Sequence, residues 1–386
     1  MFQLTKNIFN PLFSLILVLL SAGYFVTYST LLLNEQGYSD YLVGLMHAAY
    51  YVGMFLSAFV CERLLSHLGL ARSFALAGTI SSISILIMSC TYDPWTWIAM
   101  RFLAGACMGM VYIVIESWLL AYSTEFIRGR ILAIYTIFLY TAQAAGQHLL
   151  DIVSPLDSIP FIVAAALTMA GVLPLLYDTR TVPYKASESE ISSSWLQMLK
   201  NSPFGVLGGA FSGAILGAIY SFSPIFAVDY SISPAQLMSI TIFGGVALQW
   251  PLGKISDHFN RHTVLIATSL LILIPSTCIF LFPTAEVLVL ISSFLLGGLS
   301  FTIYPQSISC VIAQGKNVSF PSAVAVLLLT YGLGSSFGPI FASFFTSSSL
   351  GSSSLYLYFS CISLLLAFLG IATFQQKKLA VSKEIS

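Results

Sequence analysis

Residues 178–203, DTRTVPYKASESEISSSWLQMLKNSP, are the only long polar stretch in a chain of 386 residues. Apolar runs of about 20 residues lie on both sides of it, and this is the length that a helix needs to cross a bilayer core of about 30 Å. Only a helix satisfies its own backbone there, so each run predicts a membrane-spanning helix. The composition, 57% hydrophobic and 8% charged, also indicates a polytopic membrane protein, because soluble domains carry roughly 25% charged residues.

The polar stretch divides the predicted spans six and six. We therefore predict an N-terminal six-helix bundle at 1–177, a cytoplasmic linker at 178–203, a C-terminal six-helix bundle at 204–376 and a cytoplasmic tail at 377–386. The predicted spans are residues 11–33, 41–62, 74–91, 95–120, 131–153, 159–177, 204–228, 236–255, 263–282, 286–313, 320–346 and 353–374.

The charged residues predict the orientation of these spans. If both ends are cytoplasmic, fourteen of the fifteen Lys and Arg residues fall on the inner side, and the outer loops contain none. The positive-inside rule therefore places both termini in the cytoplasm. The first apolar run is long enough to span and no cleavage-site pattern follows it, so we expect it to remain as the first helix.

An internal repeat links the two halves. Residues 253–261 read GKISDHFNR between the predicted eighth and ninth helices, and residues 62–72 read ERLLSHLGLAR at the equivalent place in the first half. The second copy resembles, nearly position for position, the Gly-x-Leu-x-Asp-Arg-x-x-Arg loop signature of the major facilitator superfamily. In the first copy, Glu62 and Ser66 replace the Gly and the Asp.

Further motifs carry the same resemblance. RFLAGACMG at 101–109 resembles the family's fourth-helix Arg-x-x-x-Gly motif, and GLGSSFGP at 332–339 resembles its Gly-x-x-x-Gly-Pro element, here on the predicted eleventh helix. ESWL at 116–119 and QWPLGKISD at 249–257 are similar to a YcaD-like bacterial branch of the superfamily. For Gly334, Gly338 and Pro339 we expect a role in helix packing.

The resemblance implies an all-α protein of two pseudo-symmetric six-helix bundles, a multi-pass permease of the bacterial inner membrane. Members of this class rock about a site near the bilayer midplane and expose it alternately to each side. We therefore expect a secondary active transporter of a small organic solute, with proton coupling. A facilitative uniporter, or a non-transporting membrane sensor with this fold, is the alternative.

Two charged residues, Arg101 and Glu116, lie inside predicted spans, where a charge costs about 2.5–3.5 kcal/mol on insertion scales. Arg101 either extends toward the outer interface or bonds neighbouring helices, or else it binds an anionic group or tunes a proton site. A buried Glu116 carboxylate would carry a proton in each cycle. The alternative for Glu116 is a structural bond to the corner between the fourth and fifth helices.

Polar side chains at helical spacing are candidates for the substrate cavity, although each could equally be a contact between helices. The best candidate is a stripe on the predicted fifth helix, whose members lie within about 60° of one another: Thr136, Tyr140, Gln143 and Gln147. The candidates are Tyr24, Tyr28, His47, Tyr51, Tyr112, Tyr140, Gln143, Gln147, Gln249, Tyr304 and Gln306.

The inner loops predict a cytoplasmic gate. Asp257 ends the predicted eighth helix, and pseudo-symmetry would set it beside Arg128 and Arg130 at the start of the fifth. A pair between them would hold the outward-open state, and Arg261 belongs to the same loop signature. The alternative is a solvated loop charge without an energetic role.

Other functional classes lack the required residues. A Gly-x-x-x-x-Gly-Lys-Ser/Thr loop is missing from the sequence, which argues against an ATP-driven pump, and we find no catalytic or metal-binding constellation of an enzyme. The predicted partners are a small molecule, protons and the lipid bilayer, without nucleic acid. We expect neither a metal nor a bound cofactor, and a monomer suffices.

Overall fold

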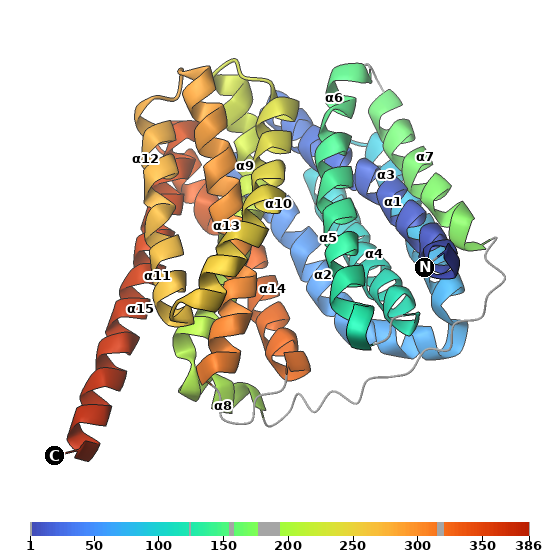
Figure 1. Cartoon of the computed structure of the whole chain (residues 1–386). Coiled ribbons are helices and arrows are strands. Elements are labelled where there is room, and N and C mark those ends of the chain that lie inside the picture. Colours follow the sequence, from blue (N-terminus) through green and yellow to red (C-terminus); the bar gives the residue numbers. More distant parts are fainter. Residues whose placement is uncertain (1, 123–124, 154–157, 177–193, 315–319, 386) are drawn as a thin grey trace. The chain divides into compact units, whose positions relative to one another are not determined.

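The computed structural model describes residues 2–122, 125–153, 158–176, 194–314 and 320–385, and these residues are helical apart from short connections (Figure 1). The helices of the first half are α1 (Phe2–Glu35), α2 (Asp40–Leu68), α3 (Leu70–Ser89), α4 (Pro94–Ala121), α5 (Glu125–Gln147), α6 (Leu149–Ile152) and α7 (Ile159–Leu176). Those that follow are α8 (Ser194–Asn201), α9 (Pro203–Asp229), α10 (Pro234–His258), α11 (Arg261–Leu271), α12 (Leu273–Leu281), α13 (Glu286–Gln314), α14 (Phe320–Thr346), the 3-10 turn η1 (Ser352–Ser354) and α15 (Leu355–Ile385).

Each predicted span coincides with helical structure. Two spans are divided, at His148 between α5 and α6 and at Ile272 between α11 and α12. Within the described ranges, ten helical segments are long and apolar enough to cross a membrane. Among the predicted spans, α5 and α10 do not reach that apolarity, because they carry polar side chains such as Gln143 and Gln249 along their length.

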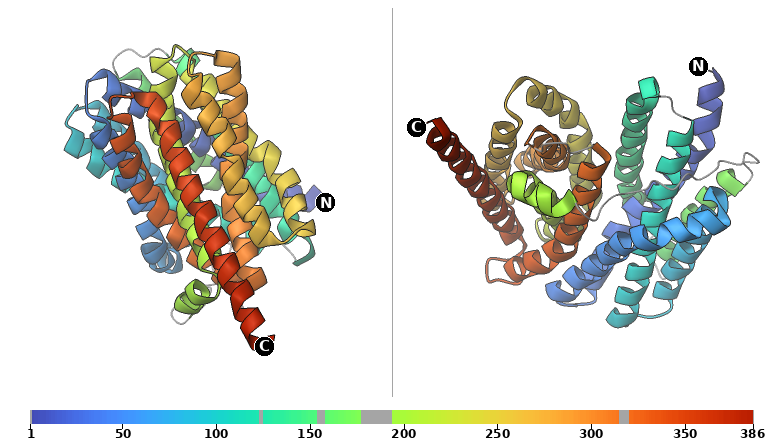
Figure 2. Two further views of the ribbon diagram at one scale, coloured as in Figure 1. Left: turned by 90° about the vertical axis from the view of Figure 1, so that its left-hand side faces the viewer. Right: turned by 90° about the horizontal axis from the view of Figure 1, so that it is seen from below.

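Internal contacts divide the chain into two units within the predicted linker. One unit comprises Met1–Ser187 with Ser233–Ser239, and the other comprises Glu188–Ile232 with Ile240–Ser386. In the first unit, α1 packs against α5 and α7, and α4 packs against α2 and α3. In the second, α9 packs against α13 and α14, and α15 packs against α11 and α12 (Figures 1 and 2).

The short helix α8 lies in the segment that the sequence predicts as a linker. It contacts α9, α13 and α14 at one end of the second unit (Figure 2). Met198 anchors it, because this side chain is buried in an apolar cluster with Val206, Val311 and Leu327. The remainder of the predicted linker, residues 178–193, lies outside the described residues.

Pairs of glycines bring parallel helices into direct backbone contact. In each pair, a Cβ on either glycine would meet the carbonyl oxygen of the residue three positions before the partner glycine. Small residues allow such close approach, which van der Waals contacts then stabilise within the bilayer. The pairs are Gly23 with Gly146 (α1 and α5), Gly53 with Gly105 (α2 and α4), Gly213 with Gly334 (α9 and α14) and Gly244 with Gly297 (α10 and α13).

The same three-residue offset between glycine and opposing carbonyl recurs in both halves, so these glycine pairs identify equivalent positions of the internal repeat. The α1–α5 pair corresponds to the α9–α14 pair, and the α2–α4 pair corresponds to the α10–α13 pair. Gly334, for which the sequence predicts a packing role, lies against the Ala210 carbonyl of α9. Gly338 packs one turn further along α14, against the backbone of Ala214.

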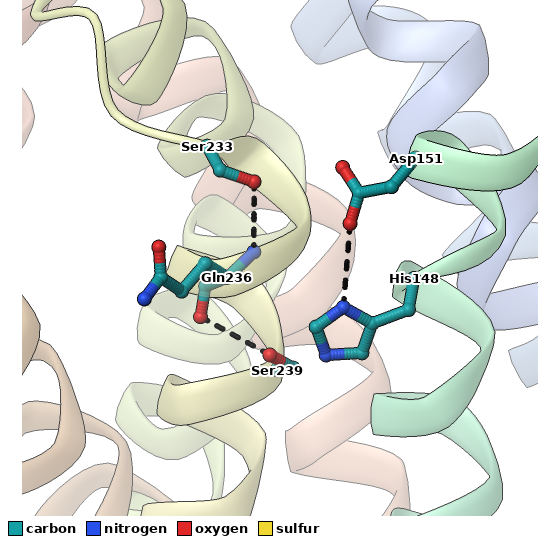
Figure 3. Close-up of polar contacts among 5 residues, drawn as sticks. All are labelled: His148, Asp151, Ser233, Gln236 and Ser239. Carbon is teal, nitrogen blue, oxygen red and sulfur yellow. Dashed lines mark hydrogen bonds and ion pairs between the residues drawn. The ribbon is translucent and has the colours of Figure 1, made fainter.

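Local hydrogen bonds fix several helix ends. Asp93 caps the N-terminus of α4, and its carboxylate accepts hydrogen bonds from the Thr96 hydroxyl and the Thr96 amide, which lower the pKa of this exposed carboxyl. The ring of His148, at the junction of α5 and α6, lies 3.4 Å from the Asp151 carboxylate (Figure 3). At the start of α10, the hydroxyl of Ser233 accepts a hydrogen bond from the Gln236 amide.

We predict that Gly105→Ala destabilises the protein, because its methyl group would press against the Tyr50 carbonyl and force α2 and α4 apart. Overpacking of this kind typically costs about 1–3 kcal/mol. Thermal unfolding of the purified protein in detergent measures the loss.

Gly253→Ala is the matched control, because no atom lies within 4 Å of a Cβ at that position of α10. Both substitutions gain the same helix propensity, so the difference between their unfolding temperatures reports the contact of Gly105 with the Tyr50 carbonyl. Equal unfolding temperatures for the two variants would contradict the glycine contact as the determinant of the α2–α4 packing.

Candidate functional site

Arg101 is buried inside the first unit, with only 4% of its surface exposed. Gly105, one turn further along α4, packs on the backbone of Tyr50 in α2 and sets the distance between the two helices. The guanidinium carbon consequently lies 4.5 Å from the centroid of the Tyr50 ring and 5.9 Å from that of Phe25. Arg101 therefore does not extend outward to the membrane interface, which was one of its two predicted structural roles.

The charge of Arg101 has no counterion among the described residues. Its Nε and Nη2 atoms are buried without a hydrogen-bond acceptor, and no described carboxylate pairs with it. The ring of Tyr50 compensates in part, since a cation over an aromatic face gains about 2 kcal/mol when desolvated. That gain is smaller than the several kcal/mol that an unpaired buried charge costs. The bundle thus maintains an unsatisfied cation in its interior.

His47 lies beside this cation. It is fully buried on α2, one turn before Tyr50, whose ring faces the guanidinium. Its Nε2 atom shares a hydrogen bond of 2.7 Å with the hydroxyl of Thr30 on α1, and its Nδ1 atom has no partner. One nitrogen of the ring is therefore fixed while the other is open.

Gln147 provides a third unsatisfied group. Its Oε1 atom accepts a hydrogen bond of 2.7 Å from the hydroxyl of Thr27, and its Nε2 atom is buried without a partner. Thr27 and Thr30 lie one turn apart on α1. Because they bond Gln147 of α5 and His47 of α2, these two side chains meet α1 within one helical turn of each other. We name Arg101, His47 and Gln147 the polar cluster.

Three of the tyrosines predicted for the cavity lie on α1 and α2. Tyr24 and Tyr28 are buried and stacked, with ring centroids 5.9 Å apart, and Tyr51 is buried next to Tyr50. Of the predicted stripe on α5, only Gln147 is fully buried. The half-buried candidates of this unit are Tyr112, Tyr140 and Gln143.

Glu116 occupies a different environment. Its side chain is exposed near the end of α4 and accepts a hydrogen bond from the hydroxyl of Tyr135 on α5, a buried residue. This bond joins α4 to α5 at Tyr135, ten residues after the start of α5, whereas the predicted structural bond was to the corner between the two helices. Arg130 is exposed, and the side chain of Arg128 lies outside the described residues.

Candidates in the second unit form separate groups. Gln306 is buried, and neither its amide oxygen nor its amide nitrogen has a partner. The ring of Tyr304 lies edge-on to Tyr331 at 5.4 Å, and Gln249 is half-buried.

The predicted gate residues of the second unit contact each other. Asp257 lies 3.9 Å from Arg261 one turn away, and Arg261 also donates a hydrogen bond of 3.3 Å to the Ser309 carbonyl. Asp257 is largely exposed in this pair, which is worth about 0–1 kcal/mol at a surface. The Arg261 side chain thus connects α11 to α13.

Sequence reasoning missed a histidine that joins three helices. His262 donates a hydrogen bond of 2.9 Å from Nε2 to the Gly370 carbonyl, and its Nδ1 lies 2.8 Å from the amide nitrogen of Gln314. Its ring packs between Phe204 and Phe374. Also missed were Thr27 and Thr30, for which an i, i+3 pair of threonines in an apolar helix was the available signal. No described set of His, Cys, Asp and Glu side chains is arranged to hold a metal.

The packing motif on α14 borders an apolar groove. Gly334, Gly338 and the ring of Phe337 line a hollow of about 640 Å³ together with residues of α9 and α15. Pro339 lies inside α14, directly after Gly338. No charged residue lines this groove.

These features define a class: a polytopic helical membrane protein with an internal repeat and unsatisfied polar groups buried in its first bundle. Comparison identifies the family. The family model of the Major Facilitator Superfamily matches residues 12–317 and 237–384, and the chain belongs to this superfamily. It is an MFS transporter, a multi-pass protein of the bacterial inner membrane, and not an enzyme.

Relatives and solved structures agree with this assignment. YcaD of Escherichia coli (strain SMS-3-5), an uncharacterised MFS-type transporter, is 29% identical over 344 residues, which cover 87% of this chain and 88% of YcaD. The same values hold for YcaD of Shigella dysenteriae serotype 1.

Two solved structures show the fold. A bacterial homologue of the human lysosomal transporter Spinster has a TM-score of 0.77 at 15% identity, covering 97% of this chain and 98% of its own. The nucleoside transporter NupG has a TM-score of 0.75 at 15% identity and covers 96% and 99%. The predicted two-bundle MFS fold is confirmed.

We predict that the hydrogen bond between Thr27 and Gln147 couples α1 to α5 by about 0.6 kcal/mol, the average for such bonds in membrane bundles. A double-mutant cycle tests this with Thr27→Val, Gln147→Leu and the double variant. Reversible unfolding in detergent measures the free energy of unfolding of each protein. A coupling free energy of zero would show that this bond is not formed in solution.

Proposed function

We propose that this transporter moves a small organic solute by alternating access and couples the movement to protons at Glu116. The observation that carries the proposal is the position of this carboxylate. In the ten candidate spans of the described chain, every other carboxylate lies at the first or last residue of a span, whereas Glu116 lies within Pro94–Ala121. A carboxylate at such a place is a functional residue by default.

The surroundings of Glu116 suit a proton carrier. Its side chain is accessible, so a proton can reach it, and no cation pairs with it among the described residues. Its partner Tyr135 donates to the ionised carboxylate and can accept a hydrogen bond from the protonated form, because a phenol both donates and accepts. Both protonation states thus keep a hydrogen bond.

Related folds support coupling as a mechanism. One solved structure of the same fold is the D-xylose–proton symporter, with a TM-score of 0.74 at 14% identity, covering 94% of this chain and 97% of that chain. The repeat defined by the glycine pairs supports alternating access, because two equivalent bundles are what rocking about a central site requires. Both termini are proposed to be cytoplasmic, as the charge distribution predicts.

We predict that Glu116→Gln abolishes solute-driven proton movement while solute exchange continues. The amide keeps the hydrogen bond to Tyr135 and cannot carry a proton. Proton flux into proteoliposomes during addition of a metabolite panel measures coupling, and counterflow of the transported solute measures exchange.

Glu286→Gln serves as the control, because this carboxylate lies in the first turn of α13 and should leave both signals unchanged. Proton flux that survives Glu116→Gln would place the coupling site elsewhere. Solute movement without any proton flux in the wild type would identify a uniporter.

We predict that Cys90 reacts from outside the cell, because it is exposed at the C-terminus of α3 on the predicted outer side. In a variant that retains only this cysteine, a membrane-impermeant maleimide should label intact cells.

The control is Ser66→Cys in a variant without other cysteines. Ser66 is exposed near the C-terminus of α2, on the predicted cytoplasmic side. It should react only after the membrane is opened. The reverse pattern of labelling would invert the proposed orientation of the whole chain.

A further inference from the structure

The polar cluster presents buried hydrogen-bonding groups that the protein does not satisfy. Arg101 contributes Nε and Nη2, Gln147 contributes Nε2 and His47 contributes Nδ1, and none of these atoms has a partner among the described residues. Three are donors, and the histidine nitrogen donates in one of its two tautomers. More than nine-tenths of each side chain is buried, so bulk water does not satisfy them.

The two open atoms of Arg101 define the shape of a ligand. Nε–H and the adjacent N–H of Nη2 point in the same direction from one edge of the guanidinium plane. This edge is the fork that binds the two oxygens of a carboxylate in parallel. The faces of the same plane are occupied, because the rings of Tyr50 and Phe25 lie within 4.5 Å and 5.9 Å of the guanidinium carbon.

The repeat provides an internal comparison that separates packing from function. Four residues before the equivalent glycines Gly105 and Gly297 stand Arg101 and Ser293. Six residues before Gly53 and Gly244 stand His47 and Met238, and directly after Gly146 and Gly334 stand Gln147 and Ser335. The second half therefore makes the same helix contacts without any of the three groups. The polar cluster is not a requirement of the fold.

We propose that the polar cluster binds the carboxylate of the transported solute, which makes this protein a transporter of organic monocarboxylates. The inference rests on the transport function proposed above. Arg101 holds both carboxylate oxygens through its open fork, and the amide of Gln147 and the ring of His47 donate to the remaining lone pairs. Arg101 is the one permanent cation of the cluster and matches one negative charge, whereas a dicarboxylate or phosphate monoester would leave charge unpaired.

The test compares acids with their neutral amides on the purified full-length protein in detergent at pH 7. The probes are benzoate and benzamide, phenylacetate and phenylacetamide, nicotinate and nicotinamide, and octanoate and octanamide. We expect at least one acid to raise the unfolding temperature in a saturable way, while its amide does not. Equal shifts for acid and amide, or no shift with any acid, would overturn the assignment.

Variants then locate the binding site. Arg101→Lys keeps the charge and loses the fork, so the affinity for the acid should fall at least tenfold, and Arg101→Gln should abolish the shift. Arg63→Lys, at an exposed arginine of α2, should bind as the wild type does. An undiminished shift in Arg101→Gln would overturn the proposal, and the wild-type comparison decides the ligand class even if that variant fails to fold.

This experiment and the proton-flux assay fail independently. If an acid raises the unfolding temperature through Arg101 but no solute drives proton flux, the carboxylate site stands and the proposed proton coupling is wrong. If a neutral solute drives proton flux but no acid raises the unfolding temperature, the transport function stands and the carboxylate site is wrong.

Discussion

Direct contact between the backbones of parallel helices is the constraint on which this structure depends. Inside a bilayer the hydrophobic effect does not drive helices together, so close packing and polar contacts must do so. Four glycine pairs supply the packing, each with the same spacing of three residues between glycine and opposing carbonyl. Because a side chain at any of these positions would separate two helices, the glycines also fix which residues one turn away are brought together.

The polar cluster follows from that constraint. The contact of Gly105 with α2 holds the guanidinium of Arg101 over the ring of Tyr50, and the contact of Gly146 with α1 holds Gln147 beside Thr27. The threonines of α1 then satisfy one atom each of Gln147 and His47, and leave the others open. A membrane bundle that maintains a cation without a counterion retains a cost in free energy, and a bound anion would offset that cost. The second half has the same contacts with serine and methionine at these positions, so the helix packing does not require this cost.

Much of the architecture was predictable from the chain itself. Span length, the single polar stretch and the loop motifs predicted twelve spans and two halves, because hydrocarbon permits only helices of a set length. The sequence also indicated Arg101, Glu116, His47 and Gln147, since polar groups in apolar runs are few. It could not predict that Glu116 is bonded by Tyr135, because that depends on the rotation of α4 against α5. The roles of Thr27 and Thr30 were missed for the same reason.

The sequence alone determined the class of protein and indicated twelve spans in two halves, because hydropathy is a property of each segment by itself, and its charge distribution predicts their orientation. Tertiary structure decided which polar atoms meet and which remain open. Arg101 could extend outward or turn inward by sequence, and the approach of α2 to α4 at their glycines placed it beneath an aromatic ring. Helix rotation and depth, set by contacts between residues distant along the chain, select among the bonds that a polar side chain could form.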